Sequence, residues 1–456
     1  MQKNNENAKK IKDILDETGP GFCLAKWTQV TMHLGSGLNH SCHHPKVHKV
    51  SPQEIKDNPS ALHNSKYKKE QRKAMLNGER PAECDYCWRI EDNTKQFSDR
   101  VYKSIEPWSL VDLEQIKKMT GSEDVFPRYV EVSFSNVCNF KCSYCGPDFS
   151  SKWVKEAKEH GAIKLPSGIE FNGLGEKQYL QREENPYVNA FWKWFPEAVK
   201  HMHTFRITGG EPLMHKSFWK LLEKLDNDPK PHIQIEVNSN MGVKPKLVER
   251  LTETVKRLKA EGKIKSFKLY TSIDTWGPRA EYARTGLDIK LWEQNLDYYL
   301  SNTNWPVTFM ITFNIFGVTS FTQLLEKILE WRTKYNSDDN ATQWQRVRFD
   351  TPHLKEPSIY DMNILPKEEF MPYMEKHLQF IKDNQDDTNR TKFTGLEYEK
   401  FKRVVEYMRT THYEPRKLEQ ARRDFHNWFK EFDRRRNCNL VETFPELEGF
   451  YNDCGK

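Results

Sequence analysis

Short runs of β-branched and aromatic residues alternate with longer helical stretches over the middle of the chain. Six runs have the length and composition of strands, and they occupy residues 128–135, 204–210, 233–240, 266–274, 307–316 and 347–352. Between them apolar residues recur with a 3.6-residue period, as at Leu247, Val248, Leu251, Val255 and Leu258. Strands that alternate with helices predict an α/β fold whose parallel sheet has right-handed crossovers and is open or curled into part of a barrel.

The regions on either side of this pattern differ from it and from each other. Residues 1–124 are polar, irregular and rich in Cys and His, whereas residues 367–456 are helical and end in a polar tail. We therefore expect three parts: a cysteine-rich module (1–124), a barrel domain (125–366) and a helical extension (367–456).

Composition and charge exclude some classes of protein. The 456 residues are 37% hydrophobic and 12% aromatic, which is enough for a large core. The net charge of +6 is small beside 71 Lys+Arg and 65 Asp+Glu, so it does not indicate nucleic acid as a partner. The most apolar window, 307–318, is too short and too polar to span a membrane. We expect a soluble cytoplasmic protein, in which clustered thiols are more often metal ligands than disulfides.

Three cysteines lie directly after the first predicted strand, in the segment CNFKCSYC: Cys138, Cys142 and Cys145. In parallel α/β folds, ligands bind at the carboxyl ends of the strands. Three thiolates can hold three irons of a four-iron four-sulfur (4Fe-4S) cluster and leave the fourth iron open to a ligand that is not protein. The alternative is a structural zinc site that a distant Cys or His completes.

Polar motifs also end the next three strands: TGGEP (208–212), NSN (238–240) and SID (272–274). Each has an ordinary explanation when taken alone. A glycine turn with a surface Glu would account for the first, and a Ser or Asp at a strand end commonly caps the following helix.

Taken together, these motifs resemble the radical S-adenosylmethionine (SAM) superfamily. CNFKCSYC is similar to its C-x3-C-x2-C signature, with the aromatic Tyr144 before the third cysteine, and TGGEPL is similar to its Gly-Gly-Glu motif. Residues 272–288 are similar to the segment that supports the cofactor in peptide-modifying members. The resemblance implies a partial six-stranded (β/α) barrel with a 4Fe-4S cluster on the three cysteines and SAM as its cofactor.

The resemblance also implies roles for residues at the strand ends. Gly209, Gly210 and Glu211 would meet the amino group of the cofactor. The remaining expected cofactor-binding residues, near its ribose or carboxylate or at the signature's aromatic position, are Tyr144, Ser239, Ser272, Asp274 and Arg284. Arg284 alone would be equally well explained by a surface ion pair.

A second set of cysteines precedes the barrel: Cys23, Cys42, Cys84 and Cys87. A Gly-x4-Cys element at Gly37 and the later C-x2-C pair are similar to the SPASM/twitch modules, which bind an auxiliary iron-sulfur cluster but usually follow the barrel. The alternative is a structural zinc bound by all four cysteines, or by three of them with a histidine from His40, His43 or His44.

The last two cysteines, Cys438 and Cys454, are expected to be thiols of a disordered tail. A hydrogen-atom donor or an extra ligand is the alternative.

The resemblance implies an oxidoreductase-type enzyme that cleaves SAM reductively to a 5′-deoxyadenosyl radical. This radical would abstract hydrogen from a substrate, which we expect to be a peptide or protein side chain. A one-electron reductant such as flavodoxin or ferredoxin would be a partner. The alternatives are an RNA or small-metabolite substrate, or a non-catalytic binding protein stabilised by metal. The Gly-Gly-Glu motif argues against the last, because a structural metal site needs no acceptor for a cofactor amine.

Overall fold

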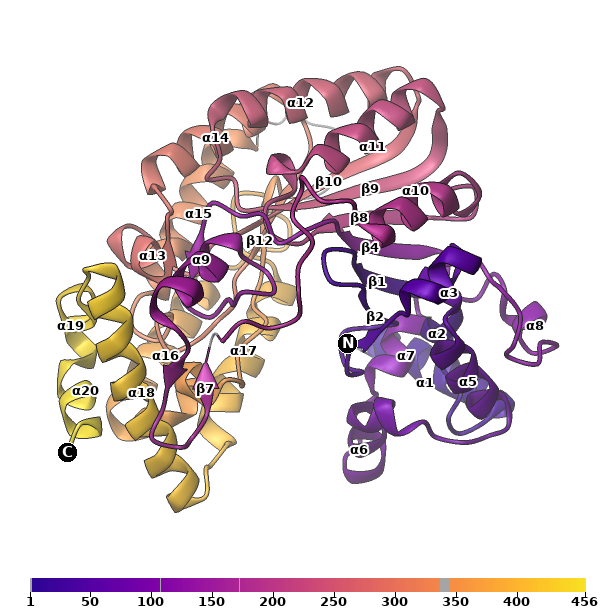
Figure 1. The fold of residues 1–456 in the computed structure, drawn as a ribbon. Coiled ribbons are helices and arrows are strands. Elements are labelled where there is room, and N and C mark those ends of the chain that lie inside the picture. Colours follow the sequence, from indigo (N-terminus) through magenta and orange to yellow (C-terminus); the bar gives the residue numbers. More distant parts are fainter. Residues whose placement is uncertain (1, 107, 172, 337–344) are drawn as a thin grey trace. The chain divides into compact units, whose positions relative to one another are not determined.

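All six predicted strands are present in the computed structural model, which describes residues 2–106, 108–171, 173–336 and 345–456. They are β4 (Tyr129–Ser133), β8 (Thr204–Thr208), β9 (Lys230–Ser239), β10 (Ile264–Ser272), β12 (Val307–Met310) and β13 (Val347–Asp350). They belong to one sheet of order β13-β12-β10-β9-β8-β4-β1-β2-β3. Figure 1 labels all of these strands except β13 and β3. The six strands lie in it in chain order, as a partial barrel with short crossovers requires, so the predicted α/β fold is confirmed.

Helices occupy every connection between these strands, as the sequence predicts. They are α9 (Ser151–His160), α10 (Pro186–Ala198), α11 (Lys216–Asn227), α12 (Pro245–Ala260), α13 (Pro278–Ala283), α14 (Ile289–Asn302) and α15 (Phe321–Tyr335). The periodic residues of α12, from Val248 to Leu258, are buried, while Leu247 lies at the margin of that face. Apolar side chains at a 3.6-residue period therefore attach the helix to the core.

The N-terminal region is more regular than predicted. Its elements are α1 (Gln2–Thr18), α2 (Ala25–Thr28), β1 (Gln29–His33), β2 (Leu38–His40), β3 (His48–Lys49), α3 (Pro52–Asp57), α4 (Ala61–Asn64), α5 (Lys66–Leu76), η1 (Ala82–Cys84), α6 (Asp85–Asn93), α7 (Asp99–Ser104) and α8 (Leu113–Ile116). Phe22, Trp27 and Trp88 belong to an apolar core of this region. The prediction of an irregular module was wrong because most of these elements are too short to produce a visible period.

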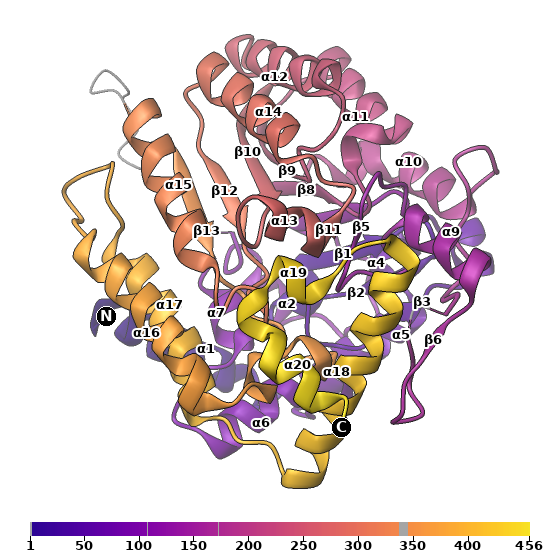
Figure 2. The same cartoon turned by 90° about the vertical axis from the view of Figure 1, so that its left-hand side faces the viewer.

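The C-terminal extension is helical, as predicted. It contains α16 (Lys367–Asp383), α17 (Gly395–Thr410), α18 (Pro415–Arg436), α19 (Leu440–Thr443), η5 (Pro445–Leu447) and α20 (Glu448–Cys454), the last three of which are yellow in Figure 2. Cys454 is only 7% exposed at the end of α20, and Cys438 follows α18 with its Sγ 3.3 Å from Asp433 Oδ1. The expected disordered tail is therefore wrong: α20 packs on α18, where the rings of Phe425 and Phe450 are 5.2 Å apart.

The remaining elements are short strands and 3-10 turns. Two-stranded sheets pair β5 (Lys141–Cys142) with β11 (Arg284–Thr285) and β6 (Ile163–Lys164) with β7 (Glu170–Phe171), and short 3-10 turns are η2 (Pro212–Met214), η3 (Ser358–Tyr360) and η4 (Met362–Ile364). Among the described residues, no helix is long and apolar enough to cross a membrane.

The chain forms two compact units that do not coincide with the three predicted parts. The first contains Met1–Ser135, Lys177–Glu236 and Leu258–Phe267. The second contains Asn136–Glu176, Val237–Arg257 and Lys268–Lys456. The N-terminal region joins the first unit because β1 pairs in parallel with β4.

Gly37 lies in the tight turn between β1 and β2, where only glycine fits. Its φ is +82°, and a Cβ there would lie 2.0 Å from Cζ of Tyr187. The ring cannot easily move, because Tyr187 is buried and its hydroxyl donates to Val50 O at 2.9 Å. The glycine of the Gly-x4-Cys element thus has a packing role.

We predict that Gly37→Ala lowers the free energy of unfolding by about 2–4 kcal/mol, from left-handed strain and overpacking together. Gly78→Ala is the matched control, because Gly78 also has a φ of +82° but a Cβ there would have no neighbour within 4 Å. Gly78→Ala should lower the free energy of unfolding by only about 1 kcal/mol. Urea unfolding with constant m-values measures both losses. Equal losses would show that Tyr187 does not restrict the turn.

Candidate functional site

The three cysteines of the triplet lie on one loop after β4. Cys142 is in β5, where it faces Arg284 of β11 in antiparallel register. The amide of Cys145 donates to Cys142 O at 3.0 Å, and the amide of Cys138 donates to Ser151 Oγ at 3.2 Å. Backbone hydrogen bonds therefore hold the cysteine loop between the β11 segment and the start of α9.

The donor set of this loop suits an iron-sulfur cluster. The three cysteines are not joined in disulfides, and each is partly exposed. In the part of the chain that the structure describes, no three His, Cys, Asp or Glu side chains are arranged around a single metal ion. In a cluster each thiolate binds a different iron, so its ligands need not converge on one point.

Three of the expected cofactor residues form a group beside Cys142, in which Asp274 and Arg284 are buried and Tyr144 is half-buried. Asp274 Oδ2 accepts a hydrogen bond from the Tyr144 hydroxyl at 2.6 Å and lies 2.9 Å from Arg284 Nε. Its Oδ1 accepts from the Thr312 amide at 3.0 Å. Arg284 Nη1 lies 3.6 Å from Cys142 Sγ. Both charges are buried, so the ordinary explanation of Arg284 as a surface ion pair is wrong.

Burial and the Arg284 guanidinium shift the pKa of the Cys142 thiol in opposite directions. Burial raises the pKa of Cys142, and the charge of Arg284 partly offsets this increase. Burial also raises the pKa of Cys145, to about 12. For Arg284 itself, burial would lower the pKa, but the charges of Asp274, Tyr144 and Cys142 raise it above its usual value. A metal that binds these thiols must displace their protons, and the adjacent cation favours the resulting thiolate.

Ser239, at the end of β9, is buried, and its Oγ accepts a hydrogen bond from the Met241 amide at 3.1 Å. Ser272 is half-buried at the end of β10, in register with Met310 of β12. Asn240 was missed among the site residues: its Nδ2 donates to Asn139 Oδ1 at 2.8 Å and lies 3.8 Å from Cys138 Sγ. Its position in the NSN motif, at a strand end, was the signal.

The Gly-Gly-Glu segment belongs to the first compact unit and ends β8. Gly209 has a φ of +114°, and a Cβ there would lie 2.2 Å from Ser133 Oγ. The Gly210 amide donates to Ser135 O at 3.1 Å. Glu211 is buried, and its carboxylate accepts from the Leu213 amide at 3.1 Å. The explanation of this motif as a turn with a surface Glu is therefore wrong.

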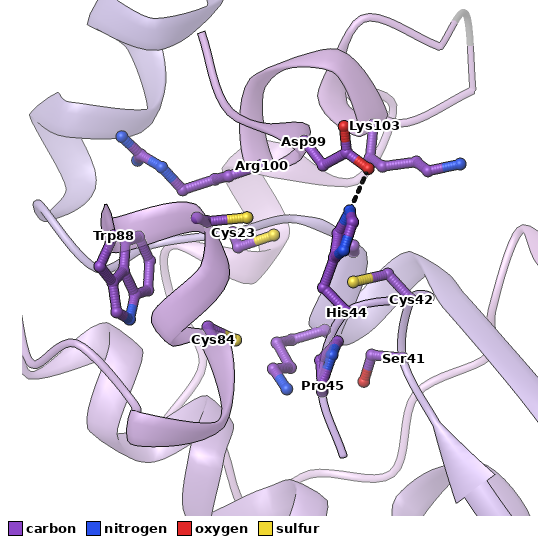
Figure 3. A pocket seen from close by; sticks show the side chains of 13 residues that line it. Cys23, Ser41, Cys42, His44, Pro45, Cys84, Trp88, Asp99, Arg100 and Lys103 are labelled. Carbon is purple, nitrogen blue, oxygen red and sulfur yellow. Dashed lines mark hydrogen bonds and ion pairs between the residues drawn. The ribbon is translucent and has the colours of Figure 1, made fainter. Parts of the chain in front are cut away.

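The four cysteines of the second set all line a single pocket. Cys23 precedes α2, Cys42 follows β2, Cys84 ends η1 and Cys87 is on α6. Figure 3 shows the labelled side chains of three of them around this space. Burial raises the pKa of Cys23, and the charges of the three other thiols raise it further. Residues that span more than sixty positions of sequence thus line the same pocket.

Of the three histidines considered as zinc ligands, only His44 is among the residues that line this pocket. Its Nε2 is 2.6 Å from Asp99 Oδ2, the interaction dashed in Figure 3, and its ring stacks on Tyr86 at 3.7 Å. His40 instead has its Nδ1 2.5 Å from Cys42 O and its Nε2 3.3 Å from His33.

Buried cations surround the same pocket. Lys26 lines it and pairs with Glu83, and Arg100 lines it with ion pairs of 2.8 Å to Asp16 and Glu91. Lys68 is buried nearby in the same unit, and its ammonium donates to Gln29 O and His63 Nδ1, each at 2.9 Å. A negatively charged group in the pocket would be favoured by these cations.

Comparison with known proteins gives a family match over the middle of the chain. Residues 132–330 match the model described as the Radical SAM superfamily. The GTP 3′,8-cyclase of Psychromonas ingrahamii is 31% identical over 127 residues, which are 28% of this chain and 30% of that protein. The enzyme of the same name from Sulfurimonas denitrificans is 22% identical over 278 residues, 60% of this chain and 71% of that one. The match thus spans less than a third of the Psychromonas relative.

Two solved structures are also similar in part. One is anSMEcpe with bound AdoMet and the Kp18Cys peptide, at 14% identity and a TM-score of 0.36, covering 58% of this chain and 62% of that chain. The other is SuiB of Streptococcus suis bound to S-adenosylmethionine, at 14% identity and a TM-score of 0.33, covering 71% of this chain and 59% of that chain.

We predict that Asp274→Asn destabilises the protein by about 3–5 kcal/mol, because it leaves the buried Arg284 guanidinium without its counter-charge. Asp288→Asn is the matched control. Asp288 caps α14 by accepting from Lys290 N and Leu291 N, and Asn caps helices equally well. Denaturant unfolding of the metal-free variants measures the difference. Similar stability of the two variants would mean that Asp274 is not needed to compensate Arg284.

Proposed function

We propose that the protein is a radical SAM enzyme that abstracts hydrogen from its substrate, because residues 132–330 match the model of that superfamily. The superfamily uses a 4Fe-4S cluster and SAM. When bound, these groups supply a 5′-deoxyadenosyl radical by one-electron reductive cleavage of SAM. A protein reductant such as a flavodoxin or ferredoxin is proposed to deliver the electron.

The observation that carries this proposal is the placement of Cys138, Cys142 and Cys145 on one loop with the Arg284 guanidinium beside Cys142. We assign the three thiolates to three irons, which leaves one iron for the cofactor. Tyr144 and Asp274 hold Arg284 in place through the hydrogen bond and the ion pair described above.

Other assigned residues would hold SAM. Glu211 is proposed to accept a hydrogen bond from the cofactor's amino group, with Gly209 and Gly210 allowing close approach of the backbone. Its burial supports this role, because a charged acceptor away from water forms a stronger bond. Ser239 and Ser272, which both end strands, are assigned to the ribose or carboxylate region.

We assign an auxiliary 4Fe-4S cluster to Cys23, Cys42, Cys84 and Cys87. Their convergence on one pocket supports this assignment, as do the cations beside it, because a metal centre held by four thiolates is negatively charged. With every iron bound by protein, such a cluster would transfer electrons or orient substrate rather than cleave SAM. Zinc would use the same four thiolates, and a metal analysis separates the two.

A peptide or protein side chain is the proposed substrate. The resemblance of residues 272–288 to peptide-modifying members and the twitch-like cysteines support it. An open pocket of about 470 Å³ is lined by Cys145 and by aromatic residues, among them Phe149, Tyr360 and Trp428. A pocket of this size could receive a side chain together with flanking backbone.

A nucleotide substrate is the second candidate, because relatives in part of the chain are named GTP 3′,8-cyclase. Incubation of the reconstituted protein with GTP, SAM and a strong reductant tests it. GTP-dependent formation of 5′-deoxyadenosine would favour the nucleotide, whereas no effect of GTP would leave the peptide as the better candidate.

We predict that anaerobically reconstituted protein forms 5′-deoxyadenosine and methionine from SAM when given a strong one-electron reductant. Cys142→Ala should abolish this product, because it removes one of three thiolates. Chromatography of the products measures it, and circular dichroism checks the fold. Cys438→Ala is the matched control and should keep the activity. Unchanged product from Cys142→Ala would remove the assignment of the triplet.

We further predict that the triple variant Cys138→Ala, Cys142→Ala, Cys145→Ala keeps about four irons per chain with a cluster absorption spectrum after reconstitution. The remaining iron should then be lost when Cys84→Ala and Cys87→Ala are both added, because only two of the four cysteines that line the pocket would remain. Iron, sulfide and zinc analysis of both variants is the measurement. One zinc and no iron in the triple variant would contradict the auxiliary cluster.

A further inference from the structure

Arg436, the last residue of α18, is inserted into the cysteine loop from the C-terminal extension. Asn437 follows it in the left-handed conformation and ends the helix. The Arg436 side chain is only 1% exposed. Its Nη1 donates to Lys141 O at 2.7 Å and to Thr285 Oγ1 at 2.8 Å, so one nitrogen joins β5 to β11. Figure 2 shows the end of α18 beside these strands and α9.

The rest of the guanidinium lies among aromatic rings and one carboxylate. Its Cζ is 4.3 Å from the ring centroid of Trp153 and 4.0 Å from that of Phe432. The Trp153 indole in turn donates to Cys142 O at 2.9 Å. Nε of Arg436 lies 3.4 Å from Glu156 Oε2, and Nη2 is buried without a hydrogen-bond partner within the described residues.

The charges at this position do not cancel. Lys141 Nζ is 2.5 Å from the same Oε2 of Glu156, so two cations share one carboxylate. Arg284 is already paired with Asp274. Arginine remains charged at all ordinary pH values. One positive charge is therefore left without a counter-charge among these groups, next to Cys142.

We infer that Arg436 is a positioning residue of the SAM cluster: it fixes the loop that carries Cys142, and its uncompensated charge stabilises the reduced cluster. The inference rests on the proposed function, because it assumes a cluster on the triplet. Three thiolates make the cluster negative, and the electron from an external low-potential donor increases that negative charge. A buried cation beside a ligand favours this state, since charge interactions are stronger away from water. The C-terminal extension would thereby help to set the reduction potential.

Three variants and one control test this inference in the full-length, anaerobically reconstituted protein. Arg436→Gln removes the charge, Arg436→Lys keeps it, and Glu156→Gln removes the shared carboxylate. Arg434→Gln is the matched control, because Arg434 is in the same helical turn but 62% exposed and paired with Glu431. The readouts are iron content and a redox titration of the reduced-cluster EPR signal that changes when SAM is added, which separates this cluster from an auxiliary one.

In Arg436→Gln we expect the ratio of reduced to oxidised cluster at a fixed potential to fall on the order of tenfold. For one electron this corresponds to a midpoint potential that is lower by about 59 mV. Glu156→Gln should shift the ratio in the opposite direction, and Arg436→Lys and Arg434→Gln should stay near the wild type. If Arg436→Gln does not retain iron, Glu156→Gln tests the inference by itself. A shift of its ratio toward the reduced cluster supports the inference, and a shift toward the oxidised cluster overturns it.

Unshifted midpoints in both charge variants would overturn the inference. So would loss of iron from both while Arg434→Gln keeps it, because the residues would then have only a structural role. A wild-type protein without a SAM-sensitive signal would instead refute the proposed function, so the two failures can be distinguished.

Discussion

The buried ion pair between Arg284 and Asp274 is the interaction on which the cysteine loop depends. It places a guanidinium opposite Cys142 in the β5–β11 pair, and the same carboxylate holds Tyr144 and the Thr312 amide. Two charges removed from water are stable only when each satisfies the other and the remaining hydrogen bonds are made. The loop, the end of β10 and the segment after the end of β12 are therefore connected through one carboxylate.

Cationic side chains lie near both groups of cysteines. Beside the triplet, Lys141 and Arg436 share Glu156. Beside the four-cysteine pocket, the Lys68 ammonium is held by neutral groups. Burying a cation without a matching anion is costly, so an anionic group bound nearby would stabilise such an arrangement. Thiolate-bound metal centres have that charge.

The main elements of the fold could be predicted because their signals are local. Each barrel strand lies in a short run rich in β-branched and aromatic residues, and the apolar face of α12 repeats at 3.6 residues, so neighbouring positions reveal these elements. The N-terminal region could not be predicted in this way. Its core is assembled from short helices and from β1, whose partner β4 lies about a hundred residues later. Likewise, the burial of Cys454 depends on α20 packing against α18.

For the candidate site, the sequence by itself determined which side chains could take part, because cysteine spacing and strand-end motifs limit the possible chemistry. It could not decide what surrounds them. Only the tertiary structure brought Cys23, Cys42 and the Cys84–Cys87 pair to one pocket, and only it placed Arg436 against β5. The physical reason is that burial and electrostatic pairing depend on distance in space, and residues almost three hundred positions apart have no local pattern that links them.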